Sequence, residues 1–161
     1  MKPSLLFLTD SLKMKPTIIL KRPVKGLSRR ALTEFVAQAC RAAKLKGSLS
    51  VMLTDSREMR SLNSRFRGKK QATDVLSFPP PALVDGFAGD IAVSLDIAER
   101  NARSLRHSVG QEVQILVLHG ILHLAGYDHE GDQGEMAEKE RRLRRRFKLP
   151  TGLIEREGRI G

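Results

Sequence analysis

Residues 109–129 read VGQEVQILVLHGILHLAGYDH. From Val109 to Leu124 this stretch is apolar on almost every side of a helix, and a helix without a polar face is buried in the core of a domain. Gly126 can take the left-handed conformation that ends a helix. The sequence therefore predicts a buried central helix, followed by a turn that folds the chain back.

Three histidines lie within this stretch. His119 and His123 are four residues apart, so both rings leave the same face of the helix, one turn apart. The turn at Gly126 can bring His129 to the same point in space. Chance burial of two such rings without a strong partner costs about 1–3 kcal/mol each, and a bound metal removes that cost. Three imidazoles with a fourth position open are typical of a catalytic rather than a structural zinc site.

Zinc proteases have the related pattern His-Glu-x-x-His-x-x-Gly-x-x-His. Gly120 occupies the position of their glutamate, which is the general base that takes a proton from the metal-bound water. Its absence argues against peptide hydrolysis. Phosphodiester cleavage depends less on such a base, because positioning and charge stabilisation dominate phosphoryl chemistry.

Periodicity on either side of the histidine stretch predicts an α+β fold with a small mixed sheet covered by helices. We expect strands at residues 17–20, 49–53, 75–78 and 90–94, with a turn at 86–89. We expect helices beginning at Ser28 and Asp55, a helix from Ser94 or Asp96 to about 106, and a basic helix at 135–147. Residues 16–161 form one domain in this interpretation. Residues 1–15 are an N-terminal extension, either disordered or the product of a misassigned start codon.

The charge of the chain points to a polyanionic partner. It has 29 Lys and Arg against 18 Asp and Glu, a formal net charge of +11, and a pI of about 10.4. Nucleic acid is the first candidate, an anionic membrane surface is the second, and a basic surface kept for solubility is the alternative. We favour contact with an RNA backbone over a merely solvated helix face for the densest basic run: Arg141, Arg142, Arg144, Arg145, Arg146 and Lys148.

Cysteine content and hydropathy indicate in which cellular compartment the protein is expected. Cys40 is the single cysteine, which excludes an intrachain disulfide and every cysteine-rich zinc finger. It lies on the apolar stripe of its predicted helix, so we interpret it as a small core residue rather than a reactive thiol. No apolar run approaches the roughly 20 residues of a membrane-spanning helix. We therefore expect a cytoplasmic protein without a membrane partner.

Three blocks of the sequence resemble the YbeY family of bacterial zinc-dependent endoribonucleases, which act in ribosomal RNA maturation. The most specific block is the histidine stretch 119–129, His-Gly-Ile-Leu-His-Leu-Ala-Gly-Tyr-Asp-His. The second holds Leu62-Asn63, Phe66-Arg67-Gly68-Lys69 and residues 73–79, Thr-Asp-Val-Leu-Ser-Phe-Pro, and the third is Gly89-Asp90-Ile91 followed by Ser94. Phe66 stands where the family usually has Tyr, and Lys70 where it often has Asp.

The resemblance implies an α+β fold, one Zn²⁺ per chain held by His119, His123 and His129, and cleavage of single-stranded RNA. It further implies action at the 3′ end of small-subunit ribosomal RNA, a role in ribosome quality control, and an active site that includes Arg67 beside His119. An arginine in a loop near the metal can hold a phosphate with two hydrogen bonds and offset transition-state charge. The alternatives are a non-catalytic RNA-binding ribosome-assembly factor with structural zinc and, less favoured, a zinc metalloprotease.

Four further residues have weaker signals. Asp128 can orient an imidazole ligand as a hydrogen-bond acceptor or can stabilise the turn, and the two interpretations are about equal. Glu112 is more simply a first-turn acid of its helix than a proton acceptor. Tyr127 can stack on a base or pack on the turn. We interpret His107 as a solvated residue at a helix end.

Overall fold

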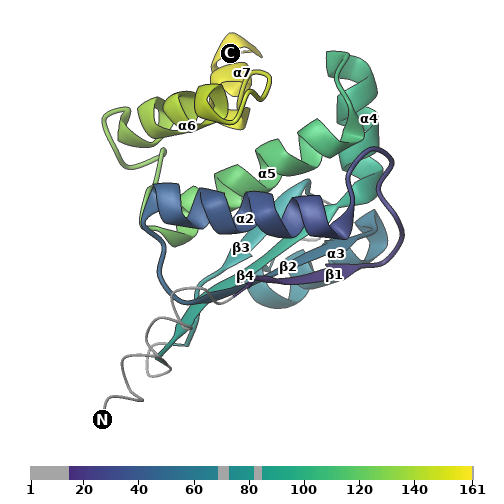
Figure 1. The fold of residues 1–161 in the computed structure, drawn as a ribbon, viewed down its shortest axis with the longest axis horizontal. Coiled ribbons are helices and arrows are strands. Elements are labelled where there is room, and N and C mark those ends of the chain that lie inside the picture. The colour runs from purple at the N-terminus through teal and green to yellow at the C-terminus, as the bar shows by residue number, and fades with distance from the viewer. Residues whose placement is uncertain (1–14, 69–72, 82–84, 161) are drawn as a thin grey trace.

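Figure 1 shows the computed structural model, which describes residues 15–68, 73–81 and 85–160. Helices and one four-stranded sheet form an α+β architecture, as predicted. Nearly all of the expected N-terminal extension, residues 1–14, lies outside the described residues, so that interpretation stays a prediction. No helix within the described ranges is long and apolar enough to cross a membrane.

The sheet is mixed, as expected. Its strands are β1 (Thr17–Leu20), β2 (Ser48–Thr54), β3 (Val75–Phe78) and β4 (Phe87–Ser94). They lie in the order β1-β2-β4-β3, with β1, β2 and β4 parallel and β3 antiparallel to β4.

Strand β4 corrects one expectation. It begins at Phe87, so residues 87–89 are strand and not turn. Gly89 has φ +131°, and a Cβ atom there would lie 2.6 Å from the carbonyl oxygen of Phe78 on the neighbouring strand. Glycine therefore stands at this position because two strands approach closely. In the sequence alone, such a glycine cannot be told from the glycine of a turn.

The helices are α2 (Arg29–Ala43), α3 (Ser56–Arg67), α4 (Leu95–Leu105), α5 (Val109–Leu124), α6 (Glu135–Arg146) and α7 (Leu153–Ile160). Ser28, Asp55 and Ser94 cap the N-termini of α2, α3 and α4 through their side chains. Helix α7 was not predicted from the sequence. It has only eight residues, so the sequence offers few apolar positions from which to predict it.

Helix α5 lies in the middle of the molecule, which explains its apolar circumference. Helices α2 and α5 pack on one face of the sheet, while α6 and α7 lie on the side of α5 away from the sheet (Figure 1). Alternate strand residues such as Val51 and Ile91 point toward the helices and are buried. On the opposite face, Met59 of α3 packs with Leu76 and Ala92. The predicted buried helix is confirmed.

Candidate metal centre

The three predicted ligands converge in the structure. His119 and His123 lie on the last turns of α5, and His129 lies in the turn that follows. One side-chain nitrogen from each ring lies within 4.8 Å of the others. Gly126 has φ +104°, the left-handed conformation expected where the chain turns back.

Hydrogen bonds assign the tautomers of the two helical histidines. His119 Nδ1 lies 2.9 Å from a carboxylate oxygen of Glu140, and His123 Nδ1 lies 3.2 Å from the backbone carbonyl oxygen of Tyr127. Both partners are hydrogen-bond acceptors, so each Nδ1 carries the proton and donates it. Each Nε2 is then left with a free lone pair, which is the form of imidazole that binds a metal.

These two Nε2 atoms face each other at 3.1 Å. Two lone pairs at this distance repel each other unless a proton or a cation lies between them. Tetrahedral zinc with Zn–N bonds of about 2.0–2.1 Å places its ligand nitrogens roughly 3.3 Å apart. The spacing of His119 and His123 therefore fits a shared metal ion.

His129 supplies further support for a metal. Its Nδ1 is buried, and among the described residues it has no hydrogen-bond partner. Burial lowers the pKa of His123, and the neighbouring His119 and His129 rings lower it further, which keeps that imidazole neutral near pH 7. Neutral imidazoles with an unsatisfied buried nitrogen fit zinc, for which nitrogen ligands are suited.

Glu140 is the functional neighbour that sequence reasoning missed. Its side chain is buried on α6 together with Met136 and Leu143. A glutamate on the apolar face of an otherwise charged helix was the available signal. Asp128 is exposed, and one of its carboxylate oxygens accepts a hydrogen bond from the Glu130 amide in the turn, at 3.2 Å. The geometry favours the turn-stabilising interpretation of Asp128.

Gly120 faces the sheet. A Cβ atom at this position would lie 3.0 Å from Ile91 Cδ1 and 3.0 Å from Ser77 Oγ. The hydroxyl of Ser77 also donates to the Gly120 carbonyl at 3.3 Å. Helix α5 packs so closely on β3 and β4 that any side chain at this position would crowd Ile91 and Ser77, which is a physical reason for the glycine in this stretch.

Arg67 is the last residue of α3, where Gly68 ends the helix in the left-handed conformation. The sequence predicts that Arg67 lies in a loop. This prediction is wrong, because Arg67 is helical. The side chain of Arg67 and residues 69–72 lie outside the described residues, so its role beside the metal stays a prediction.

The basic run divides into two groups on α6. Arg144 donates to both carboxylate oxygens of Glu155 at 2.7 and 3.0 Å, and Arg141 pairs with Glu138. Arg142, Arg145 and Arg146 are exposed. The exposed group retains the charge that an RNA contact needs, whereas Arg144 is engaged within the protein.

His107 is not a solvated residue, which corrects the sequence interpretation. Its side chain is 8% exposed, and its Nε2 lies 2.7 Å from a carboxylate oxygen of Glu112. Glu112 does lie in the first turn of α5, as expected. Its carboxylate is fully buried and also accepts two hydrogen bonds from Arg156 of α7, at 2.9 and 2.6 Å. Tertiary packing brings these groups together, so local sequence position did not reveal them.

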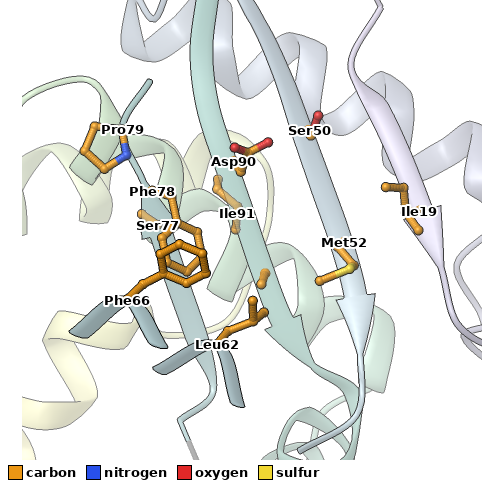
Figure 2. Close-up of a pocket in the computed structure, with 11 residues that line it drawn as sticks. Ile19, Ser50, Met52, Leu62, Phe66, Ser77, Phe78, Pro79, Asp90 and Ile91 are labelled. Carbon is orange, nitrogen blue, oxygen red and sulfur yellow. The ribbon is translucent and has the colours of Figure 1, made fainter. Parts of the chain in front are cut away.

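A groove of about 640 Å³ lies on the sheet face opposite α5, beside α3. Figure 2 shows the Phe66 and Phe78 rings beside each other there, with centroids 5.4 Å apart. Asp90 and Ser50 are among its polar lining groups. None of the three histidines lines this groove, so it is distinct from the metal centre.

Fold and site together define an α+β protein built to hold a metal ion at the end of a buried helix. The sequence profile of the family described as Endoribonuclease YbeY matches residues 16–148. This chain therefore belongs to the endoribonuclease YbeY family, which confirms the resemblance seen in the sequence.

Individual relatives agree with this assignment. An endoribonuclease YbeY from Koribacter versatilis is 55% identical over 139 residues, covering 86% of this chain and 90% of the relative. One from Solibacter usitatus is 43% identical over 142 residues, covering 87% and 93%. The solution structure of TM1509 from Thermotoga maritima matches with a TM-score of 0.53 at 35% identity, covering 79% of this chain and 85% of that one.

Proposed function

We propose that this protein is a zinc-dependent endoribonuclease that cleaves single-stranded RNA in the cytoplasm. Its substrate is ribosomal RNA, at the 3′ end of the small-subunit RNA, and it also acts in ribosome quality control. Membership of the endoribonuclease YbeY family supports the nuclease class. The single structural observation that carries the proposal is the convergence of three histidines whose ring nitrogens fit a metal ion.

One Zn²⁺ per chain would be held by His119, His123 and His129. When bound, zinc supplies a Lewis acid and a water of lowered pKa. The protein's own contribution is to fix the rings: Glu140 and the Tyr127 carbonyl hold the Nδ1 protons of His119 and His123, so both Nε2 atoms point inward. In this proposal His119 is a catalytic residue as well as a ligand, because it would contact the metal.

Arg67 is the proposed phosphate-binding residue. Its guanidinium stays protonated at any working pH and matches the geometry of two phosphate oxygens. Because Gly120 stands at the position of the protease glutamate base, stabilisation of charge on the phosphate carries more of the catalysis in this proposal. The net charge of +11 supports a nucleic-acid substrate.

Cleavage of labelled structured RNA, with and without a chelator, tests the proposal. We expect cleavage in single-stranded regions that is lost with the chelator and restored by Zn²⁺. The same assay on ribosomes tests the ribosomal substrate. RNA binding without any cleavage by the zinc-loaded wild-type protein would instead favour a non-catalytic RNA-binding assembly factor with structural zinc.

A metalloprotease is the less favoured alternative. Casein incubated with the zinc-loaded protein should stay intact, because the position of the protease glutamate is occupied by Gly120 and is packed against the sheet. Zinc-dependent casein cleavage by the purified protein would overturn the nuclease assignment.

A further inference from the structure

Glu140 connects the metal centre to the C-terminal helix. Its side chain is 1% exposed, and both of its carboxylate oxygens are engaged. Oε2 accepts the hydrogen bond from His119 Nδ1 at 2.9 Å, and Oε1 accepts one from the backbone N–H of Ile154 at 2.8 Å. Ile154 lies in the first turn of α7, where free backbone N–H groups favour a negative charge.

Helix α7 is fastened independently of this contact. Glu155 accepts two hydrogen bonds from Arg144, and Arg156 donates two to the buried Glu112. The turn before α7 passes directly over the carboxylate: a Cβ atom at Gly152 would lie 2.6 Å from Glu140 Oε1. The Glu140 carboxylate therefore lies between His119 of the metal centre and the backbone at the start of α7.

We propose that Glu140 is a positioning residue for the ligand His119, and that α7 is part of the metal centre because it holds Glu140. This inference rests on the proposed metal function of His119. The carboxylate fixes the tautomer and the ring orientation of His119 and makes its Nε2 a stronger donor to a metal. Helix α7 lies beyond residue 148, where the match to the family profile ends, so the family assignment does not cover it.

The competing explanation is that Glu140 only stabilises the start of α7. The two explanations differ in what they predict for the His119 ring itself. A residue that merely caps α7 would leave the tautomer and the metal affinity unchanged when its charge is removed. A positioning residue would change both.

The first measurement needs no substitution. Side-chain ¹⁵N NMR of the histidines in the full-length protein reports which ring nitrogen carries the proton. We expect the Nδ1–H tautomer for His119, with and without Zn²⁺. An Nε2–H or mixed tautomer in the wild-type protein would overturn the proposal, and this readout holds even if the protein proves to have no nuclease activity.

Glu140→Gln then tests the contribution to affinity. Its amide retains the size of the side chain but can present either a donor or an acceptor to the ring. We expect Zn²⁺ affinity, measured by competition with a chromophoric chelator, to fall about 10–100-fold, the range for loss of such a partner. Glu138→Gln, an exposed glutamate on the same helix, is the matched control and should leave affinity within twofold.

Gly152→Ala tests the part played by α7. The added methyl group pushes on Glu140 without changing any charge, so we expect a several-fold loss of Zn²⁺ affinity and a shifted His119 ¹⁵N signal. Unchanged affinity and tautomer in both Glu140→Gln and Gly152→Ala would reduce Glu140 to a cap of α7. Failure of the wild-type protein to bind Zn²⁺ at all would instead count against the proposed function.

Discussion

At the scale of single residues, His123 offers the cleanest test of the ligand set. Its Nε2 lies 3.1 Å from Nε2 of His119. Burial lowers its pKa, so the ring is neutral and can bind a cation. His123→Ala removes one of three ligands, and we expect the zinc content of purified protein to fall to near zero. Elemental analysis measures this, and full occupancy in the variant would refute the assignment.

Zinc removal should also lower stability, because binding to the folded state adds to the free energy of folding. We expect the melting temperature of the wild-type protein to fall with a chelator. The His123→Ala variant provides the control, since its melting temperature should no longer respond.

Arg67 is the residue-scale prediction that concerns catalysis. Arg67→Lys keeps the charge but loses the forked geometry of the guanidinium. We expect zinc content and fold to be retained while single-turnover cleavage slows on the order of a hundredfold, the effect of removing one preorganised donor. Cleavage at the parent rate would make Arg67 an ordinary surface residue, and loss of zinc would make it a structural support.

Cys40 should be unreactive in the native protein. Burial raises the pKa of its thiol from 9.0 to about 11, an effect that the nearby Arg41 only partly opposes. At pH 8 the native thiol is therefore protonated, and labelling by a disulfide reagent should be much slower than in denaturant. Because the folded state disfavours the thiolate, this group lowers stability as the pH rises from 9 towards 11. Rapid labelling of Cys40 in the native protein at pH 8 would contradict the raised pKa of its thiol.

At the scale of the element, α6 carries arginines of two kinds that the sequence does not distinguish: exposed arginines and an arginine paired within the protein. Arg142, Arg145 and Arg146 are exposed, whereas Arg144 is bound to Glu155. We expect the triple change of the exposed arginines to Gln to weaken RNA binding and to reduce the slope of log affinity against log salt by roughly one unit or less per lost phosphate contact.

Arg144→Gln is the matched control on the same helix. It removes one positive charge, as each of the three exposed changes does, but that charge is paired with Glu155. We therefore expect less than a third of the triple variant's effect on the salt slope, together with a loss of stability. Equal salt slopes for the wild-type protein and the triple variant would show that the exposed arginines only solvate the helix.

At the scale of the whole molecule, the pair Arg156–Glu112 fastens α7 to α5. Burial alone would raise the pKa of Glu112, but hydrogen bonds from Arg156 and His107 outweigh it and hold the pKa below its ordinary value. Arg156→Met would leave a fully buried carboxylate without its main partner. We expect a loss of about 3–5 kcal/mol in the free energy of unfolding, measured with denaturant.

Arg30→Met is the surface control, because its pair with Glu34 is exposed on both sides and such pairs contribute about 0–1 kcal/mol. The lowered pKa of Glu112 also determines how the stability contributed by the Arg156–Glu112 pair changes with pH. Stability from this pair is present above the ordinary carboxyl pKa and is lost as the pH falls through the lowered value. Equal losses for Arg156→Met and Arg30→Met would contradict the buried pair.

Features that depend on local periodicity and spacing could be predicted from the amino-acid sequence. The apolar circumference of residues 109–124 predicted the buried helix, and the spacing of His119, His123 and His129 around Gly126 predicted their convergence. Helix caps such as Ser28 were predictable because a cap bonds backbone groups two or three residues away.

Tertiary structure alone decided the contacts between segments far apart in the chain. Glu140 reaches His119 across 21 positions, and Arg156 reaches Glu112 across 44. The apolar neighbours of Glu140 on α6 signal that it is buried, but no local pattern identifies the partner of either residue. Gly89 looked like a turn because the sequence shows a glycine but not the neighbouring strand that requires it. Each of these residues is selected by what packs against it, and that is fixed only when the sheet and helices have assembled.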